Sequence, residues 1–391
     1  MDGASDFVTP RIGDPVPRKE DLRLLTGRGV FSDDVGLDGQ VYAAVVRSPH
    51  AHAVIKKIET EGALEVPGVL AVLTGTDALA DGLKSIPRNV MPGSPDIAIA
   101  NRDGSDYFAS PQHVLPADKT RFVGEALVMV VGETAAVAKD GAEQVRIEFA
   151  PLSSVTETAA ALQPGAPIVW EDAPDNLCVD ADVGDRAAAE AAFAGAMHVV
   201  RLETWIRRVT GVPLEPRAAV GDYNPKTERY TVYAGSGGAV RQKREAAAIL
   251  GVKLDAVRFV AGDVGGNFGT RNAFYPEFAL VAWAARRVGL PVKWTCDRRE
   301  AFLSDHQGRD LAVEAELALD AQGNILGLRG SNISNTGAYT ISFVPLVKGV
   351  EIMTGTYRIP STYLRARAIA SNTPSTNPYR SAGRPEVNFV I

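Results

Sequence analysis

The fold is decided by residues 230–289, which read YTVYAGSGGAVRQKREAAAILGVKLDAVRFVAGDVGGNFGTRNAFYPEFALVAWAARRVG. Runs of β-branched and aromatic residues predict strands here, and alanine-rich runs that stop at glycine predict helices. Two units result, each in the order strand, glycine-rich loop, helix: 230–234, 235–238 and 239–250, then 257–261, 262–269 and 275–288. Two such units in tandem indicate a domain that mixes α and β structure.

The two glycine-rich loops are the first candidates for a binding site. Glycine lacks a Cβ atom, so several backbone N–H groups can converge on one anion. The second loop, 262–269, contains four glycines and encloses Phe268. Neither loop ends in the Lys-Ser or Lys-Thr of a P-loop, and neither has the spacing of a G-x-G-x-x-G dinucleotide site. An ordinary turn is the alternative interpretation of both loops.

Composition and charge limit the class of protein. The chain has 391 residues, 46% of them hydrophobic and 23% charged, which is typical of a globular protein of two or three domains. Lys and Arg total 41 against 47 Asp and Glu, a net charge of -6 that argues against a nucleic-acid partner. Long apolar runs and a signal sequence are not seen, so neither a membrane span nor secretion is predicted. Two cysteines, Cys178 and Cys296, fit no disulfide or zinc pattern, which favours the cytoplasm.

The segment before the glycine loops predicts a separate mixed α/β domain. Strands are expected over 41–46, 68–73, 126–131 and 146–149, with a helix over 134–145. Proline, glycine and aspartate become frequent between residues 151 and 185, as they do in a linker. We therefore predict a first domain over 1–159, including an amino-terminal extension, and a second over 160–391. A helix over 186–197 and a half-buried strand over 311–320 are expected in the second.

Other residues support weaker hypotheses. Residues 377–386 hold two arginines suited to phosphate or carboxylate, although solvated arginines explain them equally well. His50 and His52 share a strand face, but a third metal ligand is not near in sequence. Cys296 is expected to be a packed thiol, not a nucleophile. The basic run 241–244 is expected to face solvent.

Five motifs, taken in order, resemble the xanthine dehydrogenase and aldehyde oxidase family of molybdenum hydroxylases. Residues 262–269 are similar to its G-G-x-F-G cofactor loop, and residues 214–217 (LEPR) to its M-E-P-R segment. Residues 378–386 (PYRSAGRPE) resemble its A-Y-R-G-x-G-R-P-E segment. Residues 47–53 (RSPHAHA) and 122–125 (FVGE) resemble segments of its α/β hammerhead domain. The match covers nearly the whole chain and implies a hammerhead domain followed by the first molybdopterin-binding domain.

The resemblance implies a molybdopterin (Mo) cofactor held mainly by backbone amides. Carried over to matching positions, the cofactor-binding residues are Gly237, Gly238, Gly265, Gly266, Asn267, Phe268, Gly269, Arg380 and Ser381. The substrate-pocket candidates are Asn272, Tyr379 and Ala382. The implied reaction is hydroxylation of an N-heterocycle or an aldehyde with oxygen from water. Electrons would then leave through 2Fe-2S clusters to FAD, carried by an iron-sulfur small subunit and an FAD medium subunit.

Three departures from the family pattern narrow this interpretation. Gly237 stands where the family often has a glutamine that faces the molybdenum. Asn272 stands where purine-oxidising members have a glutamate, which weakens the case for a purine substrate. Ser381 stands where carbon monoxide dehydrogenases have a cysteine, and the copper of those enzymes needs a soft thiolate. Carbon monoxide oxidation is therefore not expected.

The resemblance also implies a longer subunit, because family large subunits carry their general-base glutamate in a second half. We therefore expect no catalytic residue in this chain and no activity from it alone. Either a truncation or a second polypeptide carrying the carboxy-terminal half would explain the length. Two rival functions are a non-catalytic assembly module that keeps the fold without cofactor, and an enzyme that binds another phosphorylated ligand at its glycine loops.

Overall fold

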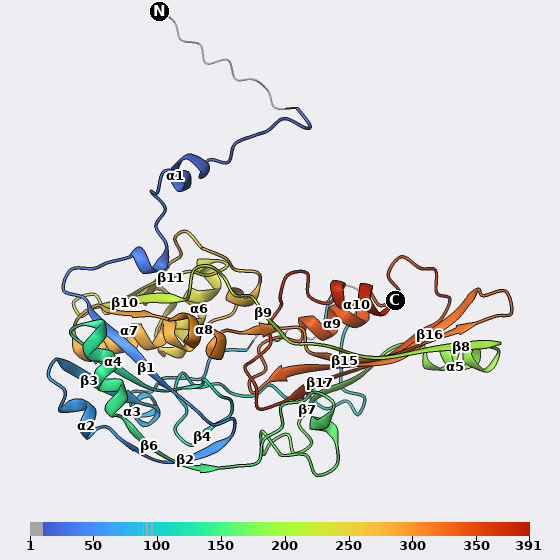
Figure 1. Cartoon of the computed structure of the whole chain (residues 1–391), viewed down its shortest axis with the longest axis horizontal. Helices are drawn as coiled ribbons and strands as arrows, with labels where there is room; N and C mark the ends of the chain where they lie inside the picture. Colours follow the sequence, from blue (N-terminus) through green and yellow to red (C-terminus); the bar gives the residue numbers. More distant parts are fainter. Residues whose placement is uncertain (1–10, 89, 91–92, 95–96) are drawn as a thin grey trace, which may run out of the picture.

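The body of the molecule consists of two β-sheets that lie side by side with helices packed on them (Figure 1). The computed structural model describes residues 11–88, 90, 93–94 and 97–391. The first ten residues of the predicted first domain therefore lie outside the described part. The amino-terminal segment, which contains α1 (Asp21–Leu25), extends away from the larger sheet (Figure 1). The mixed α/β fold that the sequence predicts is confirmed.

The larger sheet has seven strands, which come from two separate stretches of the chain, 41–132 and 218–295. Its order is β12 (Val257–Val260), β11 (Arg229–Ala234), β10 (Ala218–Asn224), β13 (Val292–Thr295), β1 (Val41–Arg47), β5 (Ala126–Gly132) and β3 (Val69–Thr74). β1 pairs in parallel with β13, with Val41 opposite Val292 and Ala43 opposite Trp294. Strands from either side of residue 160 thus share one sheet, and the division into domains at that residue stays a prediction.

Helix α7 (Pro276–Val288) is the central helix of this layer. Every residue from Glu277 to Ala285 is buried, because the helix packs on β10, β11 and β13 of the sheet and on α6. It ends at Gly289, whose φ of 71° is the left-handed C-terminal geometry that glycine favours. Helices α6 (Ala239–Ile249) and α4 (Ala135–Gln144) also pack on the sheet, at β12 and at β1 with β5.

The second sheet has five strands, in the order β7 (Leu177–Gly184), β17 (Thr362–Ala370), β16 (Ile325–Gly337), β15 (Leu311–Leu319) and β8 (His198–Ile206). Helices α9 (Val344–Glu351) and α5 (Arg186–Ala194) pack on β16 and β17, and α10 (Arg384–Val390) packs on α9. Within the described residues β8 has a neighbour only on its β15 side, and most of its residues are exposed.

Smaller elements connect these layers. They are the sheet of β4 (Lys119–Thr120), β2 (Ala53–Glu59) and β6 (Arg146–Pro151), the pair β14 (Gln307–Gly308) and β9 (Val209–Thr210), helices α2 (Glu61–Leu64), α3 (Gly75–Ala80) and α8 (Arg298–Ser304), and 3-10 turns at 32–34, 160–162, 254–256 and 270–272. No helix within the described residues is both long and apolar enough to cross a membrane.

The helices predicted over 239–250 and 275–288 are observed to within one residue of their predicted ends. The helix predicted over 186–197 ends earlier, at Ala194, because Gly195 takes the C-cap and strand pairing begins at His198.

The close approach of α7 to β10 gives the first prediction. A Cβ atom on Gly221 of β10 would lie 2.5 Å from the Ala282 backbone nitrogen, so Gly221→Ala should force the helix off the sheet. We expect a loss of about 1–3 kcal/mol in the free energy of unfolding by urea denaturation. The control is Gly195→Ala at the end of α5, where the nearest atom would be 3.8 Å away. Equal stability of the two variants would contradict this packing.

Candidate functional site

Three loops that are far apart in the sequence meet at one place on the surface. They are the first glycine loop (235–238, after β11), the second glycine loop (262–269, after β12) and the carboxy-terminal loop (377–383, before α10). The Arg380 backbone nitrogen donates to the Phe268 carbonyl oxygen at 2.8 Å. The Gly237 nitrogen donates to the Arg271 carbonyl oxygen at 3.4 Å, and a Cβ atom on Gly237 would lie 2.8 Å from the Asn267 side chain. The second glycine loop therefore has both other loops as neighbours.

The backbone at this junction adopts conformations that side chains disfavour. Phe268 and Ser381 have φ values of 50° and 61°, and Val212, in the neighbouring segment, has a φ of 38°. Such left-handed geometry in residues other than glycine costs energy and is common at functional sites. Gly266, with a φ of 120°, has the geometry for which glycine is needed.

The second glycine loop presents backbone N–H groups without protein acceptors. The amides of Gly265 and Gly269 are bound, to a Glu215 carboxylate oxygen at 2.7 Å and to the Asn267 side chain at 2.7 Å. Between them, the amides of Gly266, Asn267 and Phe268 have no acceptor among the described residues. The Phe268 side chain is 40% exposed. The loop therefore offers three successive donors at an open surface, an arrangement that suits an anion or a ring rich in acceptors.

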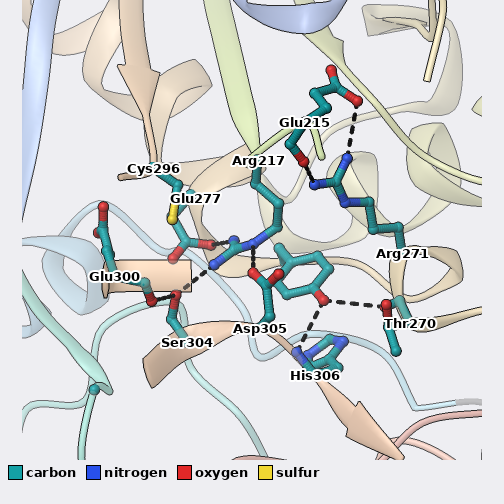
Figure 2. Close-up of polar contacts among 12 residues, drawn as sticks. Glu215, Arg217, Thr270, Arg271, Glu277, Cys296, Glu300, Ser304, Asp305 and His306 are labelled. Atoms are coloured by element: carbon teal, nitrogen blue, oxygen red, sulfur yellow. Dashed lines mark hydrogen bonds and ion pairs between the residues drawn. The ribbon is translucent and has the colours of Figure 1, made fainter. Parts of the chain in front are cut away.

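Glu215 binds this loop and the buried Arg271, and Figure 2 shows its contacts with Arg271. Its carboxylate accepts from the Gly265 amide, from the Ser32 amide at 3.1 Å and from Arg271 at 3.0 Å. Arg271 also donates to the Glu215 carbonyl oxygen. The Arg271 and Glu215 side chains are only 2% and 9% exposed. A buried carboxylate with this many donors fixes the position of the loop it binds.

A second buried cluster lies beside the first, around Arg217, which directly precedes β10 (Figure 2). It joins this residue to β1, α7 and α8. Arg217 donates to Glu277 and Asp305, each at 2.6 Å, and Arg47 donates to the other Glu277 oxygen at 2.6 Å. Burial by itself would raise the pKa of Glu277, but the Arg217 and Arg47 guanidinium groups lower it to about 2. Glu277 therefore stays ionised, as the network requires.

Tyr275 and His306 connect this cluster to the second glycine loop. The Tyr275 hydroxyl donates to the Thr270 carbonyl oxygen at 3.1 Å and accepts from the His306 backbone amide at 3.0 Å. The two rings stack at 4.0 Å, and Arg217 lies over the Tyr275 ring at 4.0 Å. Burial first, and then the nearby Arg217, lower the pKa of His306 to about 3.

Arg309 braces the carboxy-terminal loop. It donates to the carbonyl oxygens of Tyr379 and Arg380, each at 3.1 Å, and pairs with the buried Glu386 at 2.8 Å. Asn377 adds a hydrogen bond to the Gly269 carbonyl oxygen at 3.3 Å. The loop is therefore tied both to the protein interior and to the second glycine loop.

The structure brings the sequence-predicted residues together at this junction. Exposed members are Gly237, Gly238, Phe268, Asn272, Arg380 and Ser381, half-buried members are Gly265, Gly266, Asn267, Gly269 and Tyr379, and Ala382 is 6% exposed. Asn272 accepts from the Asn267 side chain at 3.0 Å and lies where a side chain at Gly237 would project. Their roles toward cofactor and substrate stay predictions.

One expectation near the junction is wrong. The run 241–244 is not wholly solvent-facing, because Gln242 is 1% exposed and donates to the Asn272 carbonyl oxygen at 3.2 Å. Gln242, Glu245 and Ile249 are all buried and lie on one face of the helix. Their helical spacing was the signal in the sequence that could have indicated a buried Gln242. Sequence reasoning also gave no role to Arg271 or Arg309, whose partners are distant in the chain.

The weaker hypotheses have these outcomes. No metal-binding group of His, Cys, Asp or Glu occurs in the described part of the chain, and the buried His52 ring contacts the Ser153 carbonyl oxygen at 3.0 Å. Cys296 is buried, as predicted, and burial raises the pKa of its thiol far above the usual range. A neutral, packed thiol is a poor nucleophile.

Comparisons with known proteins point to one family. The a/b hammerhead domain of aldehyde oxidase and xanthine dehydrogenase matches residues 26–153, and the molybdopterin cofactor-binding domain matches residues 169–391. The gamma subunit of the 6-hydroxypseudooxynicotine dehydrogenase complex of Paenarthrobacter nicotinovorans is 34% identical, over 97% of this chain and 46% of the relative. The nicotine 6-hydroxylase large subunit of the same organism is 33% identical, over 93% and 43%.

Solved structures agree with these matches. The crystal structure of quinoline 2-oxidoreductase from Pseudomonas putida 86 superposes with a TM-score of 0.85 at 31% identity, over 94% of this chain and 46% of that one. The aldehyde oxidoreductase of Desulfovibrio gigas shares the fold, with a TM-score of 0.84 at 23% identity, over 95% of this chain and 40% of that one. The chain spans about half the length of the curated relatives it matches.

Loss of the Glu215 charge should release the second glycine loop. Glu215→Gln leaves the buried Arg271 without its carboxylate, so we expect a loss of about 3 kcal/mol in the free energy of urea unfolding. The matched control is Glu314→Gln, because the Glu314 side chain is 53% exposed and lies 3.6 Å from Arg201. This control should change stability by less than about 0.5 kcal/mol. A loss at Glu215 no larger than that at Glu314 would show that the pair does not hold the loop.

The buried His306 should make stability depend on pH. Its pKa of about 3 lies below the ordinary value of about 6.5, so between these values the unfolded chain binds a proton that the folded chain does not. Stability therefore falls as the pH falls. His306→Phe should reduce the loss between pH 7 and pH 5 by about 2 kcal/mol in urea titrations.

The control for this titration is His198→Phe, because His198 is exposed on the edge strand β8. It should keep the wild-type dependence on pH. An unchanged pH dependence in His306→Phe would contradict the buried, neutral state of this histidine.

Proposed function

Because the chain belongs to the aldehyde oxidase and xanthine dehydrogenase family, as its motifs predict, we propose that it forms the amino-terminal half of a molybdenum hydroxylase large subunit. The observation that carries this proposal is the set of three unpaired amides, Gly266 to Phe268, at the junction of three loops. A pterin with phosphate groups is rich in acceptors and negative charge, so fixed backbone donors suit it.

The residues at the junction fit such a cofactor. Gly266 has no side chain to fill the space beside Pro213, and the exposed Phe268 ring borders the open face of the loop. Arg380 and Ser381 lie on the neighbouring loop, which the Arg380 amide ties to the Phe268 carbonyl oxygen. When bound, the molybdopterin group supplies an electron-accepting metal centre at which a substrate carbon is hydroxylated with oxygen from water. The chain's own part is to hold that group by backbone amides that need no rearrangement on binding.

An N-heterocycle is the substrate class that we favour over an aldehyde. Nicotine and quinoline appear in the names of a relative and a solved structure that are 33% and 31% identical to this chain over the aligned residues. Asn272 offers an uncharged amide, held by Asn267, that can donate to or accept from a ring nitrogen. Ser381 places a hydroxyl, not a thiolate, beside Arg380, so a copper site of the carbon monoxide type is not supported.

A further polypeptide segment is part of the proposal. Val199, Val200 and Trp205 on the edge strand β8 are 46–54% exposed, and Leu214, next to Glu215, is 92% exposed. Exposed apolar side chains on an edge strand suit coverage by another polypeptide. We propose that the segment equivalent to the rest of the relatives covers it and supplies the general base, and that the chain is inactive without it.

The proposed partners and location follow from the same chemistry. Electrons taken from the substrate need acceptors, and we propose an iron-sulfur small subunit and an FAD medium subunit for this role. Cys178 and Cys296 are free, buried thiols, which fits the proposed cytoplasmic location.

The test is molybdenum and pterin content of the chain purified with its complementing polypeptide. We expect both in the wild type, and loss of most pterin in Gly266→Ala, where an added Cβ atom would lie 2.9 Å from Pro213. The control Gly323→Ala also substitutes a glycine at positive φ, but at a hairpin with nothing within 4 Å, and should keep its pterin. When the complex is assayed with quinoline in ¹⁸O-labelled water, the hydroxylated product should carry ¹⁸O.

Each alternative gives a different result. A folded complex without molybdenum or pterin would overturn the proposal in favour of a non-catalytic assembly module. Bound nucleotide in place of pterin would instead favour a different phosphorylated ligand.

A further inference from the structure

The amino-terminal segment 21–32 crosses the outer side of the second glycine loop. Arg23 on α1 donates to both carboxylate oxygens of Asp263, at 2.5 and 2.6 Å. The Val30 amide donates to the same carboxylate at 2.7 Å, and the Asp263 amide donates back to the Val30 carbonyl oxygen at 3.0 Å. Asp263 is the second residue of the loop, three positions before Gly266.

The same segment contacts the Glu215 carboxylate, which binds the second glycine loop. The Ser32 amide donates to Glu215, which in turn accepts from the Gly265 amide. Residues 30–32 therefore contact Asp263 directly, and they are linked to Gly265 through the Glu215 carboxylate. The fit is close, because a Cβ atom on Gly262 would lie 2.8 Å from the Val30 carbonyl oxygen.

Apolar packing does little to hold this segment in place. Helix α1 has no buried residue, and its Leu22 and Leu25 are 69% and 85% exposed. The hydrogen bonds from Arg23 to Asp263 are therefore the main contacts that attach α1 to the rest of the molecule. The hydrogen bonds from Arg23, and then that from the Val30 amide, lower the pKa of Asp263 to about 2, so the carboxylate stays charged at any physiological pH.

We propose that residues 21–32 are a strap that fixes the second glycine loop, and that Arg23 is its positioning residue. The strap sets the angle at which the loop leaves β12, and so the direction of the three unpaired amides. Its relevance to cofactor binding rests on the proposed function, whereas its effect on the loop does not. A bidentate arginine gives the carboxylate one orientation, which a lysine cannot do.

Hydrogen exchange on the full chain tests this directly. The bound amides of Asp263 and Gly265 report the loop, because those of Gly266 to Phe268 have no acceptor to protect them. Arg23→Ala should speed exchange of the Asp263 and Gly265 amides about two- to fivefold, with no change in the temperature of global unfolding. Arg23→Lys should fall between Arg23→Ala and the wild type.

The matched control is Arg18→Ala, which removes an ion pair with Asp21 at 2.7 Å on the same segment but leaves Asp263 untouched. Its loop exchange should match the wild type. Unchanged exchange in Arg23→Ala, or equal acceleration in Arg18→Ala, would contradict the proposal that Arg23 and its segment fix the loop.

Pterin content separates this proposal from the proposed function. In the assembled complex, Arg23→Ala should retain less pterin than Arg18→Ala. If even the wild type lacks pterin while Arg23→Ala still loosens the loop, the proposed function fails and the strap stands.

Discussion

The buried carboxylate of Glu215 is the interaction on which the site depends. It joins three segments, through the Ser32 amide, the Gly265 amide and the Arg271 guanidinium. An ionised group with little exposure is stable only when its hydrogen bonds are satisfied, so each partner is held where the carboxylate requires it. The second glycine loop is consequently fixed at Gly265, while the amides of Gly266 to Phe268 remain open to a ligand.

The site combines a buried, rigid salt-bridge cluster with exposed loops. Arg217 and Glu277 are 0% and 2% exposed and lock α7 to the neighbouring strands. In the loops next to them, Phe268 and Ser381 have a left-handed backbone conformation. Such a conformation persists only where the surrounding structure holds it in place. Backbone donors held in this way bind a ligand with little further ordering cost. The proposed function needs that property, because we propose that backbone amides of this chain hold the pterin.

Local patterns predicted much of this arrangement. The glycine-rich loops and the helices at 239–249 and 276–288 follow from periodicity and from glycine at helix ends, which are short-range signals. The family motifs placed residues 377–383 beside the glycine loops. Periodicity could not reveal the pairing of β1 with β13, because strand partners distant in sequence leave no local mark. The contacts of Arg23 and Gln242 were missed for the same reason, since a surface-like pattern of charged residues hides long-range partners.

We propose above all that backbone amides of the second glycine loop bind the pterin. A density map of the assembled, cofactor-loaded complex is the sharpest test. We expect ligand density within hydrogen-bond distance of at least one amide among Gly266, Asn267 and Phe268, with the carboxy-terminal loop on its other side. Ligand density elsewhere in the complex, or a loop whose amides point away from it, would contradict the claim.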